Sequence, residues 1–243
     1  DRVLSAGQHH GLHIYLCLAL VGSELSDPGY MREHGIRTVR GPLLQQHATP
    51  DPTAEEMADI VIGTKTMPES DWLRAFLFAW AVQTFHCLGI TTQAAIAAQA
   101  AGTSYRRFYE ALLAYANHRT SSYIGSELLR TIALATDGMS GGSWGSIVPG
   151  YGNVIWPSEE ASFLWLIDAG PTLLLELYKF ISWFYAGPDL LDERPGKVRE
   201  GLRANWTGLL LPEHPPWNGD KQAWARDCLW YGRKAMKHRQ KTA

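Results

Sequence analysis

The chain of 243 residues contains only three cysteines, Cys17, Cys87 and Cys228, and they lie far apart. An odd number of scattered cysteines supplies neither a disulfide framework nor a CxxC metal-binding pair. This pattern is typical of a protein that works in a reducing compartment. We therefore expect a cytoplasmic location.

The sequence also lacks an excess of charge of either sign and any long apolar run. Lys and Arg number 22 against 24 Asp and Glu, so the broad positive surface of a nucleic-acid-binding protein is not expected. The apolar runs are interrupted well before the roughly 18 residues that a membrane span needs. We predict neither a nucleic-acid partner nor a membrane partner.

The first residues contain neither an initiator methionine nor a signal-peptide pattern, and we expect the chain to be cut from a longer protein. Residues 13–21 (HIYLCLALV) form a short apolar run between Gly11 and Gly22, which predicts a buried strand. A single strand leaves its backbone groups unpaired. We expect its partner strands to lie upstream of Asp1.

Most of the remaining chain has helical periodicity. Thr53 and Glu56 form a capping box that predicts a short helix ending near Gly63, after an extended segment at 36–39. A second capping box, together with Pro68, predicts a long core helix from Thr66 to Gly89. Long loops are expected at 138–157 and 187–219. Further helices are predicted at 91–101, 104–118, 121–136, 158–169, 171–185 and 220–238.

Two groups of polar residues are candidates for chemistry. His9, His10 and His13 could pair at helical spacing, but no third metal ligand converges with them, and a loop is the better interpretation. Gln83 and His86 lie on the apolar long helix, where polar groups must be hydrogen-bonded or face a cavity. A satisfied core position is the favoured interpretation for both, and a pocket lining is the alternative.

Four blocks of the sequence, 23–47, 60–89, 104–113 and 151–166, together resemble one family. They are similar to the C-terminal portion of cobalamin-binding radical S-adenosylmethionine (radical SAM) enzymes. The family pattern is a cobalamin domain, then a partial (β/α)6 barrel with a CxxxCxxC motif for a [4Fe–4S] cluster, then a helical tail. The resemblance implies a mainly α fold, with a helical C-terminal domain at 48–243. Residues 1–47 would hold the remnant last strand of the barrel and the segment after it.

This chain has no CxxxCxxC motif, and three scattered cysteines cannot hold such a cluster. The resemblance therefore implies no cofactor in this chain. It implies S-adenosylmethionine, a [4Fe–4S] cluster and cobalamin in a full-length parent. The implied partners are the upstream radical SAM and cobalamin domains of that parent and a small-molecule substrate.

The resemblance also suggests which residues face the substrate or a cofactor. Active sites of such barrels gather at the C-terminal strand ends, so Ser23 and Glu24 would face them. Gln45, Gln46 and His47 follow on the crossing into the helical tail, and turn or capping polarity is an equal interpretation of these three. Gln83 and His86 complete the candidate set, with no catalytic or metal-ligating residue assigned.

Two functions follow as hypotheses. In the first, the chain is the C-terminal part of a cobalamin-dependent radical SAM enzyme, a methyltransferase, in which it closes the barrel and shapes the substrate pocket. The isolated chain would then be inactive, because the cofactors carry the difficult chemistry. In the second, it is a stand-alone helical module that binds a ligand or partner without catalysis.

Overall fold

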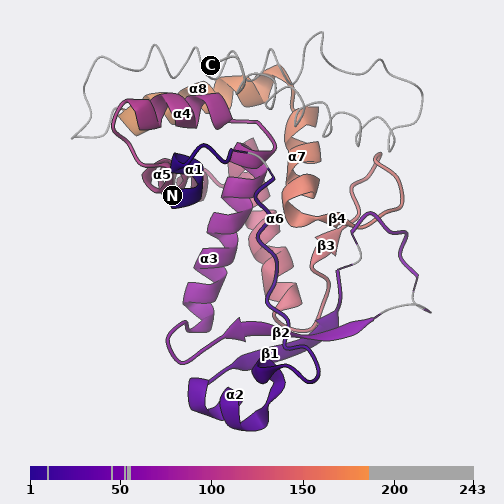
Figure 1. The fold of residues 1–243 in the computed structure, drawn as a ribbon. Helices are drawn as coiled ribbons and strands as arrows, with labels where there is room; N and C mark the ends of the chain where they lie inside the picture. Colours follow the sequence, from indigo (N-terminus) through magenta and orange to yellow (C-terminus); the bar gives the residue numbers. More distant parts are fainter. Residues whose placement is uncertain (10, 45, 52, 54–55, 186–243) are drawn as a thin grey trace.

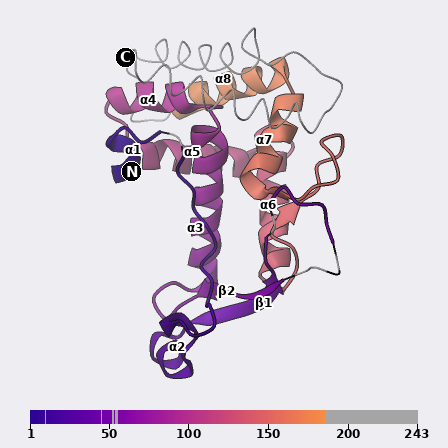
Figure 2. The same cartoon turned by 45° about the vertical axis from the view of Figure 1, so that its right-hand side comes forward.

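The computed structural model describes residues 1–185 except 10, 45, 52, 54 and 55. The described part is mainly helical with two small sheets, which confirms the predicted helical body. Helices α3, α6 and α7 stand side by side, and the larger sheet lies at one end of them with α2 beyond it (Figures 1 and 2). The predicted helix at 220–238 and the loop at 187–219 lie outside the described residues.

The long core helix is confirmed, and Pro68 is its N-cap. Helix α3 spans Glu69–Ala81 and continues into η2, a π-helical segment at Val82–Cys87. Gly89 has a φ of 99°, a left-handed conformation that glycine adopts without strain, and the helix ends there as predicted. The other predicted helices are α4 (Thr92–Ala100), α5 (Tyr105–His118), α6 (Tyr123–Gly138), α7 (Ser158–Asp168) and α8 (Pro171–Tyr185).

The helix predicted from the Thr53–Glu56 capping box is wrong. The segment forms strand β2 (Met57–Gly63), which pairs antiparallel with β1 (Arg37–Pro42). The β-branched run Ile60 to Ile62 suits a strand, and its pairing with a distant segment outweighs the local capping signal. The predicted domain boundary after residue 47 falls between these two strands, and it remains a prediction.

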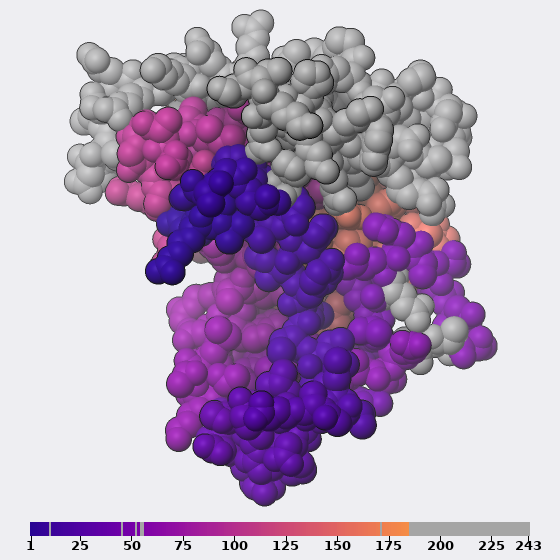
Figure 3. Space-filling model, in the orientation of Figure 1, coloured from indigo at the N-terminus to yellow at the C-terminus, as the bar shows by residue number. Residues whose placement is uncertain are grey.

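The N-terminal segment also differs from the prediction. Residues 13–21 run alongside α3 to the free edge of β2, but they form only a single antiparallel bridge, between Leu18 and Ile60 (Figure 2). Val21 is 97% exposed, so the segment is not a buried strand. Its partner among the described residues is β2, and pairing with a strand upstream of Asp1 stays a prediction. The segment extends across one face of the molecule (Figure 3).

The other short elements connect these parts. The large hydrophobic core lies among helices α3 to α8, and a smaller cluster around Ile60 and Trp144 joins the sheet to α3. The predicted loop at 138–157 contains the two-stranded sheet of β3 and β4. The remaining elements are α1 (Arg2–Ser5), η1 (Glu24–Ser26), α2 (Pro28–His34), β3 (Gly145–Ser146) and β4 (Trp156–Pro157).

Among the described residues, no single helix is long and apolar enough to cross a membrane. The segments Glu69–Cys87 and Thr92–Ala100 meet the length and composition criteria only as a pair, and they are bent by 98° at the break between them.

Candidate functional site

A pocket of about 210 Å³ lies between the N-terminal segment and α3. It is mainly apolar, and its polar groups are few, as is usual for sites that bind small organic molecules. The side chains that line it come from the N-terminal segment (Ile14, Tyr15, Leu16, Cys17), the β1–β2 connection (Leu44, Gln46), α3 and its approach (Met67, Trp72, Ala75, Phe76, Ala79, Trp80), η2 (Gln83), and the region of β3 and α7 (Trp144, Pro157, Ser158, Glu159).

One side of the pocket is an aromatic wall formed by Trp72, Phe76 and Trp144. Trp72 and Phe76 lie one helical turn apart on α3, and their rings stack 5.5 Å apart with an interplanar angle of 10°. Trp144 meets Trp72 edge-on at 5.7 Å. The spacing of Trp72 and Phe76 was visible in the sequence, where it indicated a core stripe. The partner Trp144 came from a glycine-rich loop and had no sequence signal.

Gln83 and Gln46 are the predicted residues that line this pocket. Gln83 is the second residue of the π-helical segment, a type of distortion that often occurs at functional sites. Its side chain is 6% exposed, and its Oε1 accepts a hydrogen bond from the backbone N–H of Ile14 at 2.9 Å. This bond fastens the N-terminal segment to the end of the long helix.

His47 lies beside the pocket and pairs with Glu160. Its backbone N–H donates to Ile155 O at 2.8 Å, and its φ of 62° places it in the left-handed region. In this conformation His47 Nε2 lies 2.5 Å from Glu160 Oε2, on the first turn of α7. Glu160 is largely buried, and His47 is 37% exposed. A carboxylate in this position can accept a hydrogen bond from the imidazole and orient the ring.

His86 does not line this pocket, and its ring makes polar contacts inside the core. Its ring is completely buried, with Nε2 3.0 Å from His9 Nδ1 and Nδ1 2.7 Å from the Tyr109 hydroxyl. Burial, with a smaller contribution from the neighbouring His9, lowers the pKa of His86 to about 3. The ring is therefore neutral near pH 7, and it acts as a buried hydrogen-bonding group.

Ser23 and Glu24 lie away from this pocket, at the start of the short helix η1. The Ser23 hydroxyl donates a hydrogen bond to Leu20 O at 2.6 Å, and this bond stabilises a local turn. Neither residue lines the pocket described above. Their role toward a cofactor or substrate stays a prediction, and Gln45 lies outside the described residues.

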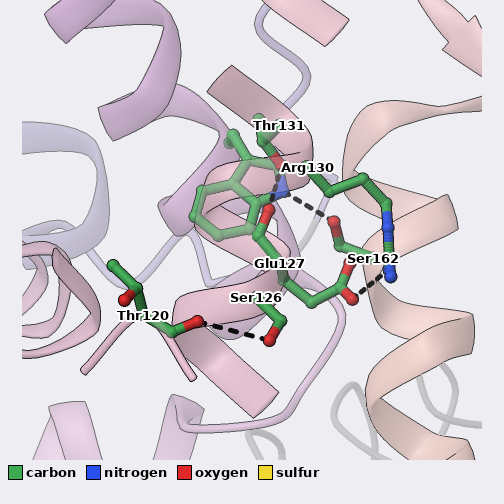
Figure 4. A network of polar contacts seen from close by, with 7 residues as sticks. Thr120, Ser126, Glu127, Arg130, Thr131 and Ser162 are labelled. Carbon is green, nitrogen blue, oxygen red and sulfur yellow. Dashed lines mark hydrogen bonds and ion pairs between the residues drawn. The ribbon is translucent and has the colours of Figure 1, made fainter. Parts of the chain in front are cut away.

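A polar network behind the pocket wall was not found from the sequence. The Trp80 indole N–H donates to Ser162 Oγ at 3.0 Å, and Ser162 faces Glu127 from the adjacent helix (Figure 4). Glu127 pairs with Arg130, whose guanidinium lies 3.9 Å from the centre of the Trp165 ring. Burial raises the pKa of Glu127 to about 7, although Arg130 and Ser162 act in the opposite direction. The network fixes the indole of Trp80 in the pocket wall.

The described residues do not fit an iron–sulfur cluster. The cysteines among them are Cys17, which is exposed, and Cys87, which is buried, and no group of three or more potential metal ligands converges in that part of the chain. Such a cluster requires thiolates from three cysteines beside the bound S-adenosylmethionine. Any cluster used by a longer protein must therefore take its ligands from outside the residues described.

Comparison with known proteins shows that part of this chain is similar to two enzymes. The chain is 34% identical over 137 residues to a cobalamin-dependent radical SAM methyltransferase, TokK, from Streptomyces tokunonensis. It is 31% identical over 137 residues to the 2-(S-pantetheinyl)-carbapenam-3-carboxylate methyltransferase of Streptantibioticus cattleyicolor. Both relatives are methyltransferases.

Each match covers 56% of this chain and 20% of the relative, so the matched region spans about one fifth of the length of these curated proteins. No protein-family model matches the chain. The resemblance noted in the sequence thus has support from two related enzymes, over part of the chain.

Proposed function

We propose that the chain is the C-terminal helical part of a cobalamin-dependent radical SAM methyltransferase, where it shapes the substrate pocket and closes the barrel. The observation that carries this proposal is the similarity to two methyltransferases over 137 residues, the first of which is named as cobalamin-dependent and radical SAM. In this proposal the cofactors lie in the remaining part of the protein and supply the methyl-transfer chemistry.

The position of the pocket supports this role. It opens beside the N-terminal segment, where Tyr15 is 70% and Leu20 is 60% exposed. Exposed apolar side chains in one segment are typical of a surface that a further domain covers. A barrel packed on this segment would place its mouth next to the aromatic wall. The helical body would then exclude water from the reacting groups.

The residues of this chain would bind and orient the substrate. The aromatic wall offers a flat apolar surface, and Gln83 offers a fixed polar contact. The His47–Glu160 pair, next in sequence to the pocket residues Gln46 and Glu159, can hold a proton at His47 Nε2. None of these residues supplies the methyl group.

The experiment compares the isolated chain with the longest natural polypeptide that contains it. Both are reconstituted anaerobically with iron and sulfide, and the cluster is counted by its absorbance and by iron analysis. The proposal predicts an upstream CxxxCxxC motif and one cluster per parent chain, with none on the isolated chain. A start codon next to Asp1, or a stoichiometric cluster on the isolated chain, would contradict it and favour the stand-alone binding module.

A further inference from the structure

The amide of Gln83 has one orientation in this structure. Because the backbone N–H of Ile14 can only donate, the side-chain atom that faces it at 2.9 Å is the oxygen of Gln83. The NH2 group therefore points away from Ile14. Among the described residues, none accepts a hydrogen bond from this nitrogen.

This unused donor belongs to a side chain that is more than nine-tenths buried and lines the pocket. Gln83 also borders a second cavity of about 20 Å³, which has room for roughly one water molecule. Only the larger pocket can hold an organic ligand. A cavity of about 150 Å³ with apolar walls binds benzene, so about 210 Å³ accommodates a single ring with a small substituent.

The walls of the pocket define the rest of the ligand. Trp72, Phe76 and Trp144 present ring faces and edges, against which a planar group packs well. The Trp144 indole N–H is buried and has no hydrogen-bond partner among the described residues. None of the described residues that line the pocket is Lys or Arg, so this lining offers no cation to hold an anion.

We propose that this pocket binds a neutral planar group with a carbonyl oxygen, of the size of an aromatic amide, and that the oxygen accepts a hydrogen bond from Gln83 Nε2. The assignment rests on the proposed function and extends it, since it names the class of substrate group that the helical body recognises.

The test uses the chain itself and fluorine NMR, with 4-fluorobenzamide as the neutral carbonyl probe. 4-Fluorobenzoate has the same ring with a negative charge, and 4-fluorotoluene has the ring without an acceptor. We expect 4-fluorobenzamide to bind more tightly than either. Comparable or tighter binding of 4-fluorobenzoate, or no binding of 4-fluorobenzamide at millimolar concentration, would overturn the proposal.

The decisive variant is Gln83→Glu, which keeps an acceptor for the Ile14 N–H but removes the amide donor. Its Kd for 4-fluorobenzamide should rise about fivefold to tenfold, the effect expected for one neutral hydrogen bond. Gln99→Glu, the same change at an exposed position of α4, should leave the Kd unchanged. An unchanged Kd in Gln83→Glu would also overturn the proposal.

If Gln83→Glu does not fold, Trp72→Leu replaces it as the test variant, because Trp72 is only half-buried and contributes to the aromatic wall. This variant should weaken the binding of 4-fluorobenzamide by a similar factor. An unchanged Kd would overturn the proposal. All these measurements need no methyl transfer. Their failure therefore leaves the proposed enzyme class standing, while an enzyme assay on the parent tests that class separately.

Discussion

The imidazole rings of His9 and His86 lie 3.0 Å apart, from Nδ1 to Nε2, inside the helical body. The contact joins the N-terminal segment to the end of the long helix across 77 residues of sequence. It places a pH-sensitive group in the core, because burial and the neighbouring His9 lower the pKa of His86 to about 3.

The free energy of unfolding should therefore depend on pH through His86. Unfolded His86 takes up a proton below its ordinary pKa of 6.5, whereas the folded protein does so only near 3. Stability is thus lost as the pH falls from 6.5 toward 3, by up to about 1.4 kcal/mol per pH unit. Urea unfolding from pH 7 to pH 4 measures this slope. His86→Asn should flatten the slope, and the exposed His118→Asn should not; equal slopes in both variants would contradict the assignment.

Deletion of residues 1–22 should destabilise the helical body rather than improve its solubility. Leu4 is 3% exposed within the main core, and the backbone N–H of Ala19 donates to Asp59 O at 2.8 Å. Both contacts are lost in the deletion. We expect a lower Tm and a lower urea midpoint. An unchanged Tm would mean that this segment is not part of the folded unit.

Glu127 should produce a pH dependence of the opposite sign. Its pKa is raised from 4.5 to about 7 by burial, so the folded state retains a proton that the unfolded state loses. Stability from this group is lost as the pH rises from 4.5 through 7. The variant Glu127→Gln should therefore gain stability relative to the wild type over that range, by roughly 1–3 kcal/mol in total, allowing for its lost pairing with Arg130.

Urea unfolding at pH 5 and pH 8 checks the prediction for Glu127. The matched change Glu110→Gln, at an exposed residue that pairs with Arg106, should give the same difference from wild type at both pH values. If the difference in stability between Glu127→Gln and the wild type is also the same at pH 5 and pH 8, Glu127 is ionised in the folded protein at both pH values. That result would contradict the prediction.

In the intact parent, His47→Asn should lower turnover while the fold is kept. Asparagine tolerates the left-handed backbone found at His47, so the loss is confined to the imidazole and its contact with Glu160. Misplacing a positioning group can reduce the rate by up to about 100-fold. Steady-state kinetics with thermal melting separates the two effects. The exposed control variant His118→Asn should leave turnover unchanged. Unchanged turnover in His47→Asn as well would mean that His47 serves only as a polar residue of the turn.

The helices of the described part could be predicted from the sequence because the signals for a helix are local. Pro68 and the four-residue spacing of Trp72 and Phe76 predicted α3 correctly. The strand β2 was missed because its pairing with β1 depends on residues about 20 positions away, while the Thr53–Glu56 box is a local signal.

The candidate site was predicted only in part for the same reason. Gln83 was singled out as a polar residue on an apolar helix, and it lines the pocket. The orientation of its amide depends on Ile14, 69 residues away, and the wall needs Trp144 from a loop. Such contacts arise from tertiary packing, which spacing along one helix does not encode.

We propose that the helical body belongs to a methyltransferase that uses cobalamin and S-adenosylmethionine. The most direct measurement supplies the intact, reconstituted parent with methyl-labelled S-adenosylmethionine, a reductant and a small-molecule extract, and follows the label by mass spectrometry. We expect label in a small-molecule product only when cobalamin is present. No labelled product from a parent loaded with cluster and cobalamin, or labelling that does not depend on cobalamin, would contradict it.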